Sequence, residues 1–223
     1  MAEGQDRAQQ FLDLKNKSDL SLLLGVSLRS ISFLLFVLPK NKLYREFNIK
    51  KRSGQDRLIY APHPALKAIQ RNLANLLQDT FSPRKHVYGF VRDRNIIANA
   101  SVHEGQRWIL RLDLEDFFPT INFGRVRGIF LKQPYKFPSD IATLLAQICT
   151  YSNQLPQGAP TSPVISNIVC RQLDRKLLKL AAENHCFVSR YADDVVFSTN
   201  AKQFPKALAS FGGPEGTEGK RAG

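Results

Sequence analysis

Two adjacent aspartates lie inside an apolar, β-branched stretch near the end of the chain. Asp193 and Asp194 are preceded by Val-Ser-Arg-Tyr-Ala and followed by Val-Val-Phe-Ser. This pattern predicts a strand, a two-residue turn and a second strand. Two exposed carboxylates at a hairpin tip repel each other unless a cation lies between them. The segment therefore requires a β-sheet and indicates a metal site at its turn.

A second strand that ends on a carboxylate lies upstream. The segment Arg-Trp-Ile-Leu-Arg-Leu leads into Asp113. If the two strands are neighbours in one sheet, Asp113 and Asp193 can hold divalent ions between them, with Asp194 nearby. Two ions about 4 Å apart are the arrangement that phosphoryl transfer to a nucleotide uses. Mg²⁺ is expected because it prefers oxygen ligands and keeps part of its shell for water and phosphate.

The charge of the chain points to a polyanionic partner. Its 223 residues carry a formal net charge of +13 and are 43% hydrophobic, which suffices for one large domain or two small ones. An excess of this size favours nucleic acid. The alternative is a basic protein with no such partner.

The cysteines and the hydropathy pattern predict a cytoplasmic protein. Cys149, Cys170 and Cys186 are odd in number and show no metal-ligand spacing, so we expect reduced core thiols. The N-terminus lacks a signal-peptide core. The longest apolar stretch, 31–38, is too short to span a bilayer and is expected to form a buried helix. No membrane partner is expected.

Apolar periodicity and turn residues outline the other elements. The expected helices cover 6–38 (ended by Pro39), a segment opening at Pro64, 96–102, 123–131, 138–149 and 162–181. A β-hairpin is expected from 43–49 and 57–60 around a polar turn. The glycine-rich segment 212–223 is expected to be disordered.

Two loops have the character of nucleotide-binding segments. Backbone amides after Asp113 could cradle a triphosphate, and Phe118 could lie under the sugar and exclude a 2′-hydroxyl; core packing is the alternative for Phe117 and Phe118. In the loop that runs into the 162–181 helix, Gly158 allows close backbone approach and Gln157 offers both a donor and an acceptor. An ordinary turn and helix cap is the alternative there.

Together, these segments resemble the ordered motifs of reverse transcriptases. The motifs are Tyr-Ala-Asp-Asp at 191–194, the 113–118 segment, Gln157-Gly158 followed by Ser162-Pro163, and Arg-Leu-Ile-Tyr-Ala-Pro at 57–62. The segment Asn-Ala-Ser-Val-His at 99–103 is similar to the Asn-Ala-x-x-His motif of bacterial retron reverse transcriptases. Tyr-Gly-Phe-Val at 88–91 also resembles that family.

The resemblance implies an α+β fold of the right-hand polymerase type, with an antiparallel palm sheet packed on helices. It divides the chain into an N-terminal helical segment (1–40), fingers (41–106), a palm (107–200) with fingers elements interleaved at 123–150, and a short helix with a tail (201–223). The thumb of the family, with its Val-Thr-Gly motif, has no counterpart. The chain therefore resembles a C-terminally truncated member.

The resemblance also implies an activity. Retron enzymes copy a structured noncoding RNA, prime from a guanosine 2′-hydroxyl within it, and make branched RNA-linked DNA (msDNA). The implied cofactors are two Mg²⁺ ions, and the substrates are deoxynucleoside triphosphates. The implied partners are the template RNA, its cDNA and a defence effector protein, because many members act against phage.

Residue roles follow from the matched motifs. The implied catalytic carboxylates are Asp113, Asp193 and Asp194, and the metal site also includes Leu114. The implied nucleotide-binding residues are Arg57, Lys51, Arg52, Asp116, Phe117, Phe118, Gln157 and Gly158, although a solvated turn is the alternative for Lys51, Arg52 and Asp116. The implied RNA-binding residues are Asn99, His103, Arg84, Lys85, Arg92 and Arg94. For His103, a buried and hydrogen-bonded histidine is the alternative.

Two other functions stay open. One is a group II intron-like or other bacterial defence reverse transcriptase, against which the segment 99–103 argues. The other is a catalytically incomplete fragment that binds RNA but does not extend a primer.

Overall fold

The computed structural model describes residues 2–50, 54 and 56–209, which form two compact units. The first unit comprises residues 1–82 and 118–169, and the second comprises 83–117 and 170–223. The segment 83–106 belongs to the second unit, where Val87 and Arg190 form a bridge, and the expected division at 40, 106 and 200 into polymerase subdomains stays a prediction. Each unit combines helices with an antiparallel sheet, which confirms the α+β class.

The first unit opens with short helices rather than one long one. They are α1 (Ala2–Leu12), α2 (Lys17–Leu24), α3 (Leu28–Ser32), the π-helical η1 (Phe33–Val37) and α4 (Lys40–Leu43). The Asn16 side chain accepts a hydrogen bond from the Asp19 amide and begins α2, and Gly25 at φ 67° ends it. The Ser27 side chain begins α3 in the same way. These caps explain why helical periodicity over 6–38 is interrupted twice.

The apolar stretch 31–38 is only half-buried, so the expected buried helix is wrong in part. Ile31 and Leu34 lie in the core, whereas Phe36 and Val37 are 64% and 65% exposed. One stripe of the helix therefore faces the protein and the other faces outward. None of the helices in the described part of the chain is by itself long and apolar enough to cross a bilayer; α2 with α3–η1 reaches that length only as a pair bent by 93°.

The predicted hairpin of the first unit is confirmed. Strands β1 (Tyr44–Lys50) and β2 (Asp56–Pro62) are antiparallel, with Tyr44 opposite Pro62 and Lys50 opposite Asp56. Exposed Lys50 and Asp56 form an ion pair of 2.7 Å beside the turn. The alternation of apolar and polar residues on both strands is what the sequence indicated.

Three longer helices supply most of the first core. They are α5 (Pro64–Thr80), α7 (Phe123–Leu131) and α8 (Ser139–Cys149), all at the predicted places. Proline at the first turn suits the start of α5, because its missing N–H has no partner there in any case. The face of α5 that carries Leu66, Ile69, Leu73 and Leu77 is fully buried.

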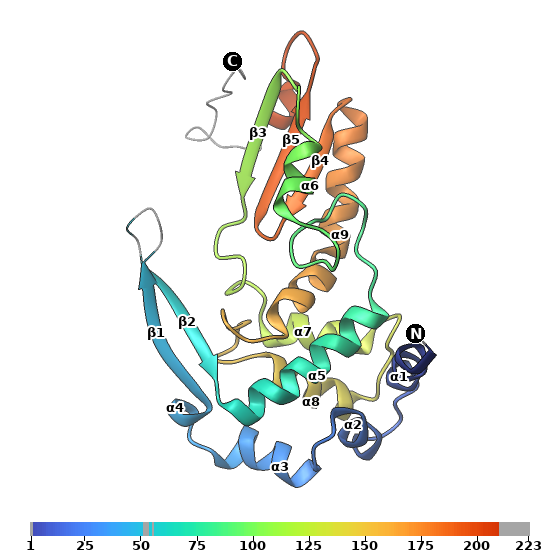
Figure 1. Ribbon diagram of the computed structural model, residues 1–223, viewed down its shortest axis with the longest axis vertical. Coiled ribbons are helices and arrows are strands. Elements are labelled where there is room, and N and C mark those ends of the chain that lie inside the picture. Colours follow the sequence, from blue (N-terminus) through green and yellow to red (C-terminus); the bar gives the residue numbers. More distant parts are fainter. Residues whose placement is uncertain (1, 51–53, 55, 210–223) are drawn as a thin grey trace. The chain divides into compact units, whose positions relative to one another are not determined.

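The second unit is a three-stranded antiparallel sheet with helices on its faces (Figure 1). Its elements are α6 (Ile96–Ser101), β3 (Trp108–Asp113), β4 (Phe187–Tyr191), β5 (Asp194–Thr199) and α10 (Lys206–Ala209), in the strand order β3-β5-β4. Helix α9 (Ser162–Glu183) contributes its residues from Cys170 onward to this unit. On one sheet face, Leu110, Val188 and Phe197 form a core with Ala181 of α9.

The cysteines agree with the expectation of core thiols. Cys149 and Cys170 are buried and Cys186 is half-buried, and none of the three forms a disulfide. Burial raises the pKa of the Cys149 thiol to about 12, because a thiolate is poorly solvated in the interior. This thiol is therefore protonated and unreactive at neutral pH.

Candidate active site

The three predicted carboxylates meet at one end of the sheet in the second unit. Asp113 is the last residue of β3, and its partner across the ladder is Asp194, the first residue of β5. The backbone amide of Leu114 donates a hydrogen bond to the Asp193 carbonyl at 3.0 Å, which ties the turn to the end of β3. The expectation that the two strands are neighbours is therefore confirmed.

The turn between β4 and β5 differs in detail from the predicted tip. It consists of Ala192 and Asp193, whereas Asp194 already belongs to the strand. Asp193 and Asp194 are both half-buried, and Asp113 is exposed. Ala192 adopts φ 58°, the left-handed conformation that lets so short a connection reverse the chain. The prediction of two exposed carboxylates at the tip is therefore wrong, because the second one joins the ladder.

A cation already accompanies Asp194. The Arg111 guanidinium donates from Nε to Asp194 Oδ1 at 2.8 Å and from Nη2 to Oδ2 at 2.9 Å. Arg111 lies on the same sheet face as Asp113, two residues before it in β3. Repulsion between the neighbouring carboxylates is therefore offset by an arginine, in addition to any metal ion.

The donor chemistry of the remaining groups fits a hard divalent cation. The carboxylates of Asp113 and Asp193 and the backbone carbonyl of Leu114 are oxygen ligands, and Mg²⁺ typically takes one or two carboxylates and fills its shell with water and phosphate. Within the described residues, no set of three or more His, Cys, Asp or Glu side chains is arranged around a common point. The predicted membership of Asp194 in the metal set thus competes with its ion pair to Arg111.

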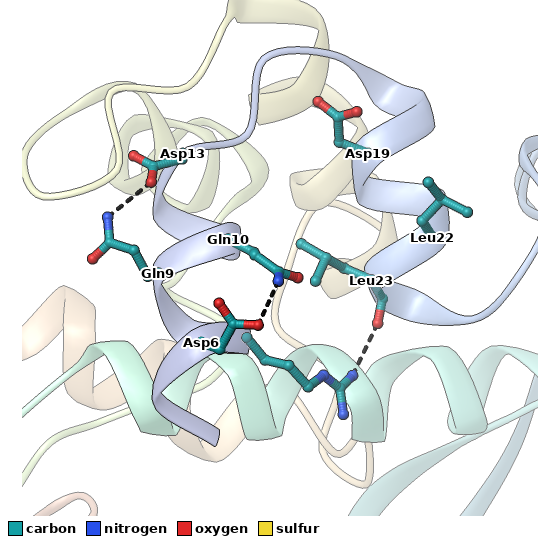
Figure 2. Close-up of a pocket in the computed structure, with 8 residues that line it drawn as sticks. Asp6, Gln9, Gln10, Asp13, Asp19, Leu22 and Leu23 are labelled. Atoms are coloured by element: carbon teal, nitrogen blue, oxygen red, sulfur yellow. Dashed lines mark hydrogen bonds between the residues drawn. The ribbon is translucent and has the colours of Figure 1, made fainter. Parts of the chain in front are cut away.

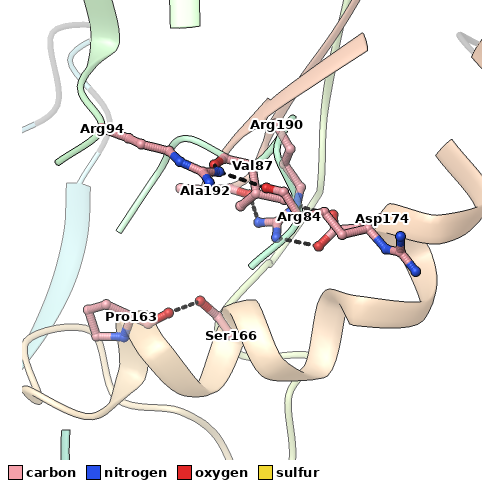
Figure 3. A network of polar contacts seen from close by, with 8 residues as sticks. All are labelled: Arg84, Val87, Arg94, Pro163, Ser166, Asp174, Arg190 and Ala192. Atoms are coloured by element: carbon pink, nitrogen blue, oxygen red, sulfur yellow. Dashed lines mark hydrogen bonds and ion pairs between the residues drawn. The ribbon is translucent and has the colours of Figure 1, made fainter. Parts of the chain in front are cut away.

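A buried ion pair between Arg190 and Asp174 lies beside the turn and contacts it (Figure 3). Arg190 of β4 is fully buried, and its Nε and Nη2 donate to the two oxygens of Asp174 on α9 at 2.6 and 2.9 Å. Its Nη1 donates to the Ala192 carbonyl at 2.9 Å. The guanidinium therefore links the helix to the turn that carries Asp193.

Sequence reasoning assigned no role to Arg111, Arg190 or Asp174. The sequence did contain a signal for Arg190. It lies two residues after Val188, on the same inward face of an apolar strand, and a charge at such a position needs a buried partner. No local pattern in α9 identifies Asp174 as that partner, which only the three-dimensional structure shows.

In the first unit, the structure brings together two of the predicted nucleotide-binding segments. The Tyr60 amide of β2 donates to the Gln157 carbonyl at 2.8 Å. Gly158 adopts φ 118°, and a Cβ there would lie 2.9 Å from the Tyr60 carbonyl oxygen, so the loop requires glycine. Arg57 is exposed on the same strand, three residues before Tyr60. Lys51 and Arg52 lie outside the described residues.

The residues after Asp113 divide between the two units. Asp116 is exposed at φ 46°, as expected for a solvated turn. Phe117 is 7% exposed, which favours core packing for this side chain. Phe118 is partly buried against the core of the first unit. A part of its surface is thus open to another molecule, as a residue that contacts a sugar would require.

The structure places His103 in the interior of the second unit. Its side chain is 6% exposed, with Nδ1 2.7 Å from Ser198 Oγ and Nε2 2.7 Å from Ser189 Oγ. Burial lowers its pKa, so the ring is neutral at pH 7. Both nitrogens are occupied by β4 and β5, which argues against the predicted direct RNA contact. The alternative of a buried, hydrogen-bonded histidine is the one observed. Asn99 is also buried, at 8% exposure.

The four predicted phosphate-binding cations have different surroundings. Arg84, Lys85 and Arg92 are exposed. Arg94 is half-buried, and its Nη1 donates to the carbonyls of Arg84, Lys85 and Val87. Its guanidinium also lies 5.9 Å from the centre of the Tyr88 ring. Arg94 therefore holds its own loop together through Nη1, and its contact with an RNA phosphate stays a prediction.

A separate hollow lies on the N-terminal helices of the first unit (Figure 2). Its volume is about 700 Å³, and its polar lining is bonded internally: Gln9 donates to Asp13, Gln10 to Asp6, and Arg7 to the Leu23 carbonyl. The sequence singled out none of these residues. They show no arrangement of nucleophile, base or metal ligands.

Comparison with known proteins identifies a family that this chain resembles. Residues 49–211 match the reverse transcriptase (RNA-dependent DNA polymerase) family. The retron Mx65 reverse transcriptase of Myxococcus xanthus is 36% identical over 219 residues, which cover 88% of this chain and 51% of the relative. The retron Ec86 reverse transcriptase of Escherichia coli is 33% identical over 190 residues (84% and 58%), and the retron Mx162 enzyme of M. xanthus is 33% identical over 222 (90% and 45%). The chain thus spans about half the length of these curated relatives.

Proposed function

The chain belongs to the reverse transcriptase family, and we propose that it carries the catalytic carboxylates of a retron-type RNA-directed DNA polymerase. The observation that carries the proposal is the convergence of Asp113, Asp193 and Asp194 where β3 ends and β5 begins. The resemblance of 99–103 to the retron motif and the retron relatives favour this type over a group II intron-like enzyme. In this proposal the second unit is the palm, and the hairpin of the first unit belongs to the fingers.

The proposed reaction is the transfer of a nucleotidyl group. The terminal hydroxyl of the primer attacks the α-phosphorus of a deoxynucleoside triphosphate, a P–O bond forms, the bond to pyrophosphate breaks, and the hydroxyl proton leaves to solvent. Two Mg²⁺ ions, when bound, supply activation of the hydroxyl and neutralisation of the pyrophosphate. Asp113, Asp193 and the Leu114 carbonyl would hold them. Asp194, oriented by Arg111, completes the negative charge of the site.

The first unit would bind the incoming nucleotide. Arg57 would contact its triphosphate, helped by Lys51 and Arg52. The loop at Gln157 and Gly158 would lie against the base or sugar, and Phe118 would exclude a 2′-hydroxyl. The exposure of Gly158 supports the assignment, because a residue without a side chain lets a ligand approach its backbone closely. Asp116 and Phe117 would contribute only through their backbone.

The RNA would contact the basic surface of the chain. Arg84, Lys85 and Arg92 are exposed, and A-form RNA is recognised through its phosphates and 2′-hydroxyls rather than through its bases. We include in the proposal a structured noncoding RNA as template and primer, branched RNA-linked DNA as product, a cytoplasmic location, and a defence effector protein as partner. The RNA, the product and the effector are supported by the resemblance to retron enzymes, and the location is supported by the cysteine pattern.

Primer extension tests the proposal. The substrates are a structured RNA with a branching guanosine and, separately, a linear RNA template with a DNA primer, both with Mg²⁺ and labelled deoxynucleotides. Asp193→Asn should lower incorporation by ~10²–10³-fold, the range for removing one group that stabilises transition-state charge. RNA affinity should change little. Asp140→Asn, at an exposed ion pair with Lys17 in the first unit, is the matched control and should behave as wild type.

The outcomes separate the candidate functions. Wild-type synthesis by Asp193→Asn would refute the metal-site assignment. Extension of the linear primer without use of the structured RNA would favour a group II intron-like or other reverse transcriptase. A chain that binds RNA and extends neither primer would be an RNA-binding fragment, a function that the net charge of +13 also supports.

A further inference from the structure

The segment 84–94, called here the Gly89 loop, runs alongside the catalytic hairpin in the second unit. The Tyr88 amide donates to the Arg190 carbonyl at 2.8 Å, and the Arg190 amide donates to the His86 carbonyl at 2.9 Å. Val87 and Arg190 thereby form an isolated parallel bridge. The loop is thus paired with β4 up to the residue that precedes Tyr191.

Beyond that bridge, Gly89 presses against the turn itself. A Cβ on Gly89 would lie 2.2 Å from the Ala192 nitrogen and 2.9 Å from the Tyr191 carbonyl carbon. Both atoms are backbone, so no side-chain movement can relieve the clash. Gly89 does not adopt a positive φ. Space, rather than backbone conformation, is therefore what requires glycine here.

Besides its pairing with β4, the Gly89 loop has internal contacts that hold its shape. Arg94 Nη1 donates to the carbonyls of Arg84, Lys85 and Val87 (Figure 3 shows the contact with Val87). Phe90 and Asp93 adopt left-handed conformations at φ 61° and 62°, which fold the loop back on itself. One guanidinium thus joins the two ends of the loop, and the loop can act as a fixed support.

The turn is held at three places around Asp193. The Ala192 carbonyl accepts from Arg190, and the Asp193 carbonyl accepts from Leu114. Gly89 closes the third side, at the Ala192 nitrogen. Ala192 alone absorbs the left-handed conformation, so a shift at its nitrogen is transmitted to Asp193 through a single residue.

We propose that Gly89 is a positioning residue for the catalytic reaction: the Gly89 loop sets the place of the Tyr191–Asp194 turn and thereby the distance between Asp193 and Asp113. The proposal rests on the proposed function and adds to it a residue that touches neither substrate nor metal. To bring a Cβ from 2.2 Å to an ordinary contact of 3.4 Å, the turn or the loop must move by about 1 Å. A displacement of that size in an active site costs ~10²-fold in rate.

The test compares Gly89→Ala with Gly128→Ala in the full chain. Gly128 lies in α7 with nothing within 4 Å of its Cβ position, so its substitution adds the same methyl group without a clash. The first measurement is the affinity for Mn²⁺ alone, by electron paramagnetic resonance without RNA or nucleotide. The second separates kcat from KM for the deoxynucleotide in primer extension.

Gly89→Ala should weaken Mn²⁺ binding ~10-fold or more, within the range found when a group that orients metal ligands is lost. It should lower kcat ~10²-fold while KM and RNA affinity stay within about twofold of wild type. Gly128→Ala should match wild type in all four. A purely structural role for Gly89 would instead lower the amount of folded protein and leave the Mn²⁺ affinity of the folded fraction unchanged, which would overturn the proposal.

A second variant decides the question if Gly89→Ala does not fold. Arg94→Met removes the clamp on the loop at a distance from the turn, and should weaken Mn²⁺ binding by a smaller factor, ~3-fold. Mn²⁺ affinities of the folded variants within twofold of wild type would refute the proposal. The Mn²⁺ measurement does not depend on polymerase activity. A wild-type chain that binds Mn²⁺ but extends no primer would therefore overturn the proposed function and leave the positioning role supported by the variants.

Discussion

The buried pair of Arg190 and Asp174 makes the stability of the second unit unusually sensitive to one carboxylate. The two side chains are 0% and 3% exposed, and two hydrogen bonds of 2.6 and 2.9 Å join them. Asp174→Ala removes the carboxylate that accepts two hydrogen bonds from a fully buried guanidinium. We therefore expect the buried guanidinium to lose its charge-assisted contacts with this carboxylate.

The expected loss is large on the scale of domain stability. Breaking a buried ion pair by removing one partner costs ~3–5 kcal/mol in free energy of unfolding. For a chain of this length each kcal/mol lowers the melting temperature by ~2–4 °C, so Asp174→Ala should lower it by ~6–20 °C. The hydrogen bond from Arg190 to the Ala192 carbonyl should weaken as well, because the same guanidinium makes both contacts.

Urea unfolding followed by circular dichroism measures the effect. The control is Glu183→Ala, which breaks the exposed Lys179–Glu183 pair of 3.6 Å on the same helix and should cost at most ~0.5 kcal/mol. The double substitution Asp174→Leu with Arg190→Met should recover at least half of the loss, since replacing both charges by apolar groups removes the unpaired ion. An Asp174→Ala variant destabilised by less than ~1 kcal/mol would refute the reasoning.

Two further predictions concern single residues. Burial lowers the pKa of His103 below the ordinary value of 6.5, so its contribution to stability is complete above that value and is lost as the pH falls toward the folded-state pKa. In urea unfolding at pH 7.5 and 5.5, His103→Gln should therefore lose less stability on acidification than wild type. Equal losses would contradict this prediction. Gly158→Ala should lower the free energy of unfolding by more than ~1 kcal/mol, because φ 118° and a 2.9 Å contact with the Tyr60 carbonyl both exclude a side chain. Gly128→Ala should instead stabilise α7 by up to ~1 kcal/mol. A similar urea midpoint for the two variants would show that the loop rearranges freely.

Elements with local signals were predicted well from the sequence. The hairpin of β1 and β2, the start of α5 at Pro64, and the strands that carry Asp113 and Asp194 all depend on periodicity and turn residues within a short window. Helix breaks were missed at Asn16 and Gly25, although both residues are typical caps. They lie within a longer apolar pattern that dominates the window.

Side-chain roles that depend on distant contacts were not predictable in the same way. His103 reaches Ser198 and Ser189, which lie 95 and 86 residues further along the chain. The sequence offered RNA contact and burial as alternatives for this histidine, and no local pattern separates them. Arg94 was predicted to bind phosphate because the sequence alone does not distinguish an exposed basic residue from one that donates to backbone carbonyls.

The strand order of the second unit has a consequence for self-association. Within the described part of the chain, β3 lies at one end of the order β3-β5-β4 and pairs only with β5, whereas the outer edge of β4 is paired at Val87. An unpaired edge invites strands from other molecules and promotes aggregation, and charged side chains along it are a common protection. Arg111 and Asp113 lie on the same face of β3 and are exposed, so an incoming strand would have to desolvate both. The same carboxylate that we assign to catalysis would thus also keep neighbouring copies of the chain from joining their sheets.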